Sequence, residues 1–158
     1  MKKILLIGGE GYIGSVLIND LINNNFQIKS LDLNIYDDQK QIKFNESTNL
    51  DCLRLDIRND SLLDNHLKDV SFVVVLAGLV GEFITKKYPK LSKEINEDAI
   101  IKLIDKIDNF KNIKNLIFIS TCSNYGITTN NILVDEDHEL NPLSPYAKAK
   151  VKVEKYIL

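Results

Sequence analysis

The sequence of 158 residues has no tryptophan and contains only three prolines, two histidines and two cysteines. Cys52 and Cys122 lie far apart and form no C-x-x-C pair, and His66 and His138 are the only imidazoles available to a metal site. This composition predicts neither a metal site nor a disulfide. We expect two buried free thiols, as in a protein of the reducing cytoplasm.

Long apolar runs and a strong charge of one sign are also missing. The net charge is −2, which gives no electrostatic reason to bind nucleic acid or an anionic membrane. No apolar run approaches the roughly 20 residues that a membrane-spanning helix needs. The basic start is followed by a very short apolar run that ends at Gly8, so we expect no signal peptide. The length fits one domain, residues 1–158.

Glycine is scarce, and all seven glycines follow one of three predicted strands. Gly8, Gly9, Gly11 and Gly14 follow the apolar run 3–7, Gly78 and Gly81 follow 72–77, and Gly126 comes shortly after 116–119. Glycine allows positive φ and lets a ligand approach the backbone closely. In open α/β sheets, ligands bind beyond the carboxyl ends of the strands. The distribution therefore predicts a ligand at that edge of the sheet.

Strand-like and helix-like segments alternate along the chain. Short β-rich runs lie at 3–8, 27–33, 51–56, 71–77 and 115–120. Helical patterns cover about 13–22, a short segment from Asp60 or Ser61 to Leu67, about Leu91 to Asn109, and a last helix with Ser144 as N-cap and Pro145 at its first position. Residues 34–49 are polar and patternless, and we interpret them as a loop. The order predicts an α/β fold with a doubly wound parallel sheet of about five strands.

The first motif, residues 8–14, reads Gly-Gly-Glu-Gly-Tyr-Ile-Gly between a predicted strand and an amphipathic helix. Gly8, Gly11 and Gly14 suit, in that order, a tight turn, close approach of a pyrophosphate, and close packing of helix on strand. The helix N-terminus would supply N–H groups and a dipole for the phosphates. The alternative interpretation is a tight turn without a ligand.

Two aspartates are predicted to lie at the same edge of the sheet. Asp32 ends the second strand 18 residues after Gly14, near the spacing of a ribose-binding carboxylate. No Arg or Lys follows it before Lys40, so NAD should bind in preference to NADP. Asp56 ends the third strand, where an adenine ring would sit, although taken alone it is better explained as an N-cap or a surface carboxylate.

The second constellation consists of Thr121, Tyr146 and Lys150. Tyr146 and Lys150 are four residues apart at the start of the last helix and so share a face. A tyrosine with a pKa of about 10 is a poor acid or base at neutral pH unless a neighbouring cation favours the phenolate, and Lys150 can supply that cation. Thr121, predicted to end the fifth strand, can hold a substrate oxygen beside the phenol. Taken alone, the pair would be a core tyrosine and a solvated lysine.

Together these motifs resemble the extended short-chain dehydrogenase/reductase family, in its NAD-dependent epimerase/dehydratase branch, over residues 3–158. The resemblance implies a Rossmann fold that binds NAD and a nucleotide-sugar substrate. It implies that Thr121, Tyr146 and Lys150 are catalytic, and that Lys150 lowers the pKa of Tyr146 and binds the nicotinamide ribose. The cofactor-binding residues that it implies are Gly8, Gly11, Tyr12, Ile13, Gly14, Asp32, Asp56, Ile57, Leu76, Ala77, Gly78, Asn96, Tyr146 and Lys150.

Departures from the family pattern narrow the expected activity. Sugar dehydratases of this family carry Asp-Glu after the catalytic threonine, where this chain has Cys122-Ser123, so dehydration is not expected. Val75 and Gly78 replace a histidine and an alanine, which should not abolish cofactor binding. Family members also continue well beyond the Tyr-Lys helix with a C-terminal substrate-binding lobe, whereas this sequence ends at Leu158. We expect either a truncated reading frame or a half that stands alone.

The sequence therefore predicts an NAD-dependent nucleotide-sugar epimerase or reductase that uses transient hydride transfer, with a tyrosine as general acid and base. The alternative from another functional class is a truncated, non-catalytic NAD-binding module, with a homodimer through the long helices as its assembly. A polypeptide without a stable fold is a third. The sugar and its nucleotide carrier are not specified by these motifs.

Overall fold

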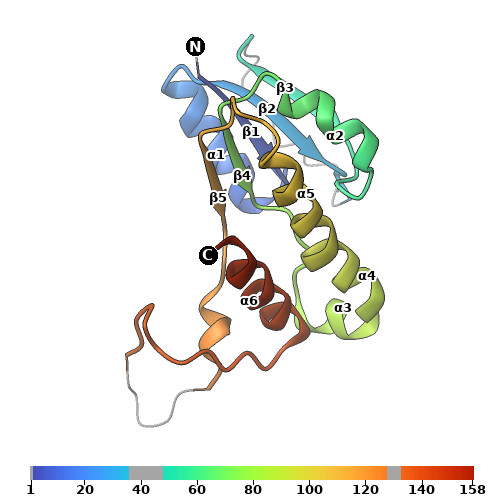
Figure 1. The fold of residues 1–158 in the computed structure, drawn as a ribbon, viewed down its shortest axis with the longest axis vertical. Coiled ribbons are helices and arrows are strands. Elements are labelled where there is room, and N and C mark those ends of the chain that lie inside the picture. Colours follow the sequence, from blue (N-terminus) through green and yellow to red (C-terminus); the bar gives the residue numbers. More distant parts are fainter. Residues whose placement is uncertain (1, 36–47, 128–132) are drawn as a thin grey trace. The chain divides into compact units, whose positions relative to one another are not determined.

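The computed structural model describes residues 2–35, 48–127 and 133–158 (Figure 1). Most of the predicted loop 34–49 therefore lies outside the described residues. The chain divides into two compact units. The first comprises Met1–Ala77 and Lys102–Ile119, and the second comprises Gly78–Ile101 and Ser120–Leu158.

The first unit contains a five-stranded sheet in the order β3-β2-β1-β4-β5, and every pairing is parallel. Its strands are β1 (Lys3–Ile7), β2 (Gln27–Asp32), β3 (Leu50–Arg54), β4 (Phe72–Val75) and β5 (Asn115–Phe118). All five correspond to predicted strands, and the doubly wound α/β fold is confirmed. Several end earlier than predicted, because the residues after β3, β4 and β5 leave the ladder.

Helices α1 (Tyr12–Asn23) and α2 (Asp60–Leu67) flank the strands of this unit (Figure 1). Ile18 of α1 is fully buried in a cluster with residues of β1, β2 and β4. Burying an aliphatic side chain of this size contributes about 1.5–3 kcal/mol. The asparagines at 23–25 end α1, and Asn25 adopts the left-handed φ of 60°. Helix α2 has Asn59 as its N-cap.

The second unit is mostly helical. It contains α3 (Glu82–Lys87), α4 (Pro89–Lys93), a π-helical turn η1 (Glu94–Asp98), the start of α5 (Ala99–Ile107), a 3₁₀ turn η2 (Cys122–Tyr125) and α6 (Pro145–Ile157). The long helix predicted over 91–109 is thus present, but a π-turn interrupts it. Neither α3 nor η2 was predicted, because each is too short to show an apolar period.

The cysteines correct one expectation. Both are free thiols, but Cys52 and Cys122 are exposed rather than buried. Cys52 lies on β3, an edge strand of the sheet among the described residues, and Cys122 begins the η2 turn. Among the described residues, no cluster of His, Cys, Asp and Glu could hold a metal ion. Within the same residues, no helix is both long and apolar enough to span a membrane.

Candidate functional site

The glycine-rich turn after β1 is held against β2 and against the end of β4. Gly8 has φ of 84°, and its N–H donates to Leu31 O at 2.8 Å. A Cβ at Gly8 would lie 2.6 Å from Ala77 N, and one at Gly14 would lie 2.6 Å from Gly9 Cα. Any side chain at these two positions would therefore push the turn away from β4 or push α1 away from the turn. The tight turn predicted at Gly8 is present, and Gly14 lets the helix pack closely, although against Gly9 of the turn. The approach of a pyrophosphate at Gly11 stays a prediction.

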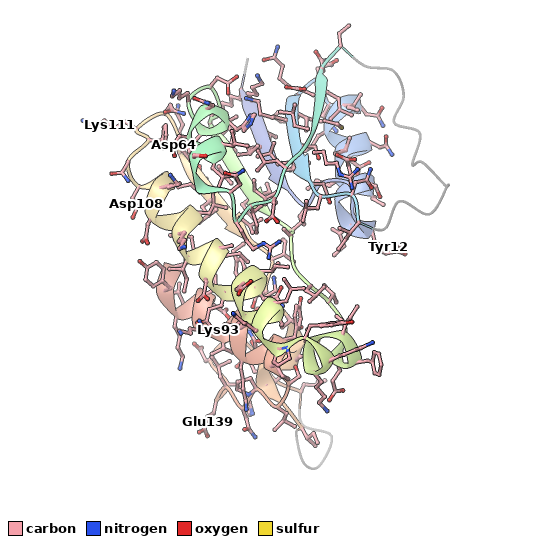
Figure 2. The ribbon with its side chains drawn as sticks, turned by 90° about the vertical axis from the view of Figure 1, so that its right-hand side faces the viewer. Tyr12, Asp64, Lys93, Asp108, Lys111 and Glu139 are labelled. Carbon is pink, nitrogen blue, oxygen red and sulfur yellow. The ribbon has the colours of Figure 1, made fainter. Side chains whose placement is uncertain are left out.

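Helix α1 begins directly at this turn without a side-chain cap. Its N-cap is Gly11, and its first turn contains no acidic residue. Tyr12 is 92% exposed and lies at the start of the helix on the outside of the first unit (Figure 2). Ile13, the next residue, is more than half exposed. An uncapped helix N-terminus beside glycines is suited to bind an anion such as a pyrophosphate.

Asp32, the last residue of β2, connects its strand to the turn. Its Oδ2 accepts from Glu10 N at 3.0 Å, and its Oδ1 accepts from Asn34 N at 2.9 Å. Each carboxylate oxygen thus accepts one backbone N–H and retains a second lone pair. The two hydrogen bonds fix the carboxylate of Asp32 beside the glycine-rich turn, and its binding of a ribose remains a prediction.

Asp56 has a local partner. Its carboxylate accepts from the Arg58 guanidinium, at 3.0 Å from Nε and 2.5 Å from Nη2, and from Arg58 N at 2.9 Å. The hydrogen bond to Arg58 lowers the pKa of Asp56. Asn59 rather than Asp56 caps α2, so the N-cap interpretation is wrong. Ile57 beside it is buried, while Leu76 and Ala77 after β4 are half-buried and both donate their N–H to Ile7 O at 2.8 Å.

In the second unit, Asn96 holds the segment that follows β4. Its Oδ1 accepts from Leu79 N at 2.7 Å, and its Nδ2 donates to Leu79 O at 3.0 Å and to Ser92 Oγ at 3.2 Å. Asn96 is fully buried, and a Cβ at Gly78 would lie 3.1 Å from its Oδ1. Both amide hydrogens are therefore used within the protein. Asn96 would assist a cofactor by fixing Gly78 and Leu79.

Tyr146 and Lys150 lie in the first turns of α6. Ser144 caps this helix as predicted, accepting from Ala147 N at 3.1 Å, and Pro145 is its first residue. Lys150 Nζ lies 5.6 Å from the centre of the Tyr146 ring, within the range of a cation–π contact. Lys150 is only 2% exposed, so the interpretation as a solvated lysine is wrong.

Burial sets the ionisation of this pair. It lowers the pKa of Lys150 to about 8. It also raises the pKa of Tyr146, the direction opposite to the one that the family resemblance implies. The physical reason is that desolvation penalises the charged form of both groups. A lowered Tyr146 pKa in the NAD complex remains a prediction.

Thr121 does not end β5, which stops at Phe118. It is instead the N-cap of the η2 turn, and its Oγ accepts from Ser123 N at 3.2 Å. The side chain is half-buried and its hydroxyl hydrogen remains available in this arrangement as a donor. Sequence reasoning missed three polar residues near it, namely Ser120, Asn124 and Glu154, which hydrogen-bond to one another. The feature of the sequence that could have indicated them is the position of Glu154, four residues after Lys150 on the same helical face.

Comparison with known proteins agrees with these motifs. The model of the NAD dependent epimerase/dehydratase family matches residues 4–158. UDP-glucose 4-epimerase of Lactobacillus helveticus is 30% identical over 97% of this chain and 45% of its own length. The solved UDP-N-acetylglucosamine 4-epimerase from Methanobrevibacter ruminantium, in complex with UDP-N-acetylmuramic acid, is 29% identical with a TM-score of 0.89, covering 99% of this chain and 49% of that one.

A UDP-glucuronic acid 4-epimerase mutant from Bacillus cereus, solved with a UDP-sugar analogue and NAD, is 27% identical with a TM-score of 0.85 over 98% of this chain and 51% of that one. The chain thus spans about half the length of the relatives that it matches. The family model nevertheless covers almost all of its residues, including the glycine-rich turn and the Tyr-Lys helix. The chain therefore belongs to the NAD dependent epimerase/dehydratase family.

Proposed function

We propose that this chain binds NAD and supplies the proton-transferring residues for the epimerisation of a UDP-linked sugar. The buried Lys150 against the Tyr146 ring is the observation that carries the catalytic part of this proposal. Lysine is almost never fully buried unless it is paired, and here the ammonium group of Lys150 lies against the ring of Tyr146. The relatives named above are UDP-sugar 4-epimerases, which supports a UDP-sugar as the substrate class.

The residues of the first unit fit NAD. The pyrophosphate would bind at the uncapped N-terminus of α1. In this turn the surrounding backbone leaves no room for a side chain at position 8 or 14, and both are glycine. Asp32 would accept hydrogen bonds from the adenosine ribose. When bound, NAD supplies the hydride acceptor and donor that reversible oxidation of a sugar carbon requires.

The residues of the second unit fit the proton transfer. Tyr146 would take the proton from the sugar hydroxyl and later return it. Lys150, protonated below a pH of about 8, would favour the phenolate form of Tyr146 from one helical turn away. Thr121 would donate a hydrogen bond to the same sugar oxygen. We also propose a cytoplasmic location, which the two free thiols support.

Two measurements on the purified chain test the proposal. The first is a titration of NADH, whose emission should show saturable binding. In the second, concentrated protein is incubated for a long time with NAD and UDP-glucose, and chromatography then measures the conversion of the sugar. We expect binding but conversion many orders of magnitude slower than in an enzyme that positions the sugar fully. Any conversion should disappear in Tyr146→Phe and persist in Tyr156→Phe, a control at the far end of α6.

The outcomes separate the alternatives. Absence of NADH binding would contradict the whole proposal. Conversion that survives Tyr146→Phe would contradict the assigned role of Tyr146. Binding with no conversion at all would favour the alternative of a non-catalytic NAD-binding module. Rapid conversion would show that the 158-residue chain is sufficient for catalysis, contrary to our expectation.

A further inference from the structure

Three polar side chains of the second unit form a closed network between the η2 turn and α6. Glu154 Oε2 accepts from Ser120 Oγ at 3.1 Å and from Asn124 Nδ2 at 2.9 Å. Asn124 Nδ2 also donates to Ser120 Oγ at 2.9 Å. Asn124 is only 3% exposed, while Ser120 and Glu154 are half-buried. A carboxylate acceptor strengthens such bonds relative to neutral ones.

Two residues of the network flank Thr121 in the sequence. Ser120 precedes Thr121, and Asn124 follows it by three residues. The turn is closed internally, because Ser123 N donates to Thr121 Oγ at 3.2 Å and Asn124 N donates to Thr121 O at 3.3 Å. Asn141 N donates to Asn124 O at 2.9 Å and attaches the turn to a third segment. The position of Thr121 is therefore set by what Ser120 and Asn124 bind.

Glu154 lies on the helical face that carries the other two residues of the proposed site. Tyr146, Lys150 and Glu154 follow one another at intervals of four residues in α6. Residues at this spacing are neighbours on a helix surface. The same helical face thus holds the Tyr146–Lys150 pair and the acceptor that anchors the Thr121 turn.

We infer that Glu154 is a positioning residue, whose carboxylate fixes Thr121 relative to Tyr146. This inference rests on the proposed function, in which both groups address one sugar oxygen. Asn124 Oδ1 is buried and has no hydrogen-bond partner among the described residues. An unpaired buried acceptor costs stability, so the network is not the arrangement that would make the fold most stable. Its role in holding Thr121 in place explains it better.

Three variants of Glu154 separate position from charge. Glu154→Gln retains an acceptor oxygen at the same reach, Glu154→Asp retains the charge but is one methylene shorter, and Glu154→Leu removes the acceptor. Lys155→Ala, at an exposed position of the same helix, is the matched control. In the parent protein, the NMR signals of the Asn124 side-chain amide should be distinct and slow to exchange with solvent. We expect Gln to preserve this signature and Asp and Leu to lose it.

A second readout reports on Thr121 itself and would not respond to a purely structural role. With isotope-labelled threonine methyl groups, the Thr121 signal should shift when Tyr146→Phe is introduced into the parent protein. When Tyr146→Phe is introduced into Glu154→Gln, the Thr121 signal should shift by the same amount. When it is introduced into Glu154→Asp or Glu154→Leu, the shift should be at most half as large. If Glu154→Leu fails to fold, the comparison of Gln with Asp decides.

An unchanged Thr121 response in Glu154→Asp or Glu154→Leu, or no response in the parent protein, would overturn the inference. NADH binding is measured in parallel and should stay within twofold in every single Glu154 variant that folds, because the glycine-rich turn and Asp32 belong to the first unit. Failure of the parent to bind NADH would contradict the proposed function while leaving both NMR readouts interpretable.

Discussion

At the scale of single residues, Asp32 has a structural role to which the proposed function adds recognition of the cofactor. Its two oxygens already accept Glu10 N and Asn34 N, so the carboxylate cannot turn away from the site without releasing the turn. A fixed negative charge at this place favours ribose hydroxyls and repels a 2′-phosphate.

We therefore predict that the chain binds NADH at least tenfold more tightly than NADPH, and that Asp32→Asn reduces this ratio. Titration of both reduced cofactors by their own emission measures it, since the chain has no tryptophan. Asp51→Asn removes an exposed charge from the adjacent strand β3 and is the control, expected to leave the ratio within twofold. Tighter binding of NADPH by the parent chain would contradict the prediction.

Lys150 makes stability depend on pH in a definite direction. In the unfolded chain it keeps its proton up to a pKa near 10.5, whereas in the folded protein burial brings the pKa to about 8. Between these values unfolding takes up a proton, so the contribution of Lys150 to stability rises with pH and is lost as pH falls through about 8. A shift of this size corresponds to about 3 kcal/mol.

The free energy of unfolding of the parent chain, relative to that of Lys150→Met, should therefore increase by about 3 kcal/mol between pH 7 and pH 11. Urea unfolding at several pH values measures this difference, in which the contributions of the other titrating groups cancel. Lys148→Met, at an exposed position of α6, should show no such trend. A difference that is flat with pH would mean that Lys150 is hydrated in solution.

At the scale of elements, the π-turn decides which side chains of the helical stretch from Pro89 to Ile107 are buried. The extra residue of a π-turn changes which side chains face inward, and here the consecutive residues Asn96 and Glu97 are both buried. Asn96 uses that position to bind both polar backbone groups of Leu79.

We predict that Asn96→Ala lowers the free energy of unfolding by about 2–4 kcal/mol, because it leaves the buried N–H and C=O of Leu79 without partners. Ser92→Ala, which removes only one bond to the same amide, should cost about 1 kcal/mol. Asn109→Ala, which removes an exposed bond to Asp105 O, is the control. Equal effects of the three substitutions in thermal unfolding would show that the Leu79 contact is not special.

The elements also show what sequence reasoning can reach. The strands and α6 were predictable because each combines an apolar period or run with a local signal, such as the Ser144 cap. The π-turn was not predictable, since an uninterrupted α-helix explains the spacing of the apolar residues from Leu91 to Ile107 equally well. The exposure of Cys52 was missed because nothing local marks β3 as an edge strand, and the polar network was missed because Asn124 and Glu154 are distant in sequence.

At the scale of the whole molecule, the sheet of the described residues has β3 and β5 at its edges. Strand β5 is short, pairs only with β4 among these residues, and carries Ile117 at 52% exposure. Edge strands with exposed apolar side chains favour association between copies, and a lysine at such a position opposes it.

We predict that the 158-residue chain self-associates through β5, and that Ile117→Lys shifts sedimentation towards the monomer while leaving NADH binding within twofold. The reason is that a lysine on the free edge places like charges together when two copies pair strand against strand. Ile127→Lys, which introduces the same charge at an exposed residue of the second unit outside any strand, should leave association unchanged. If Ile117→Lys associates as strongly as the parent chain, the edge is not the contact, and the long helices become the surface to vary next.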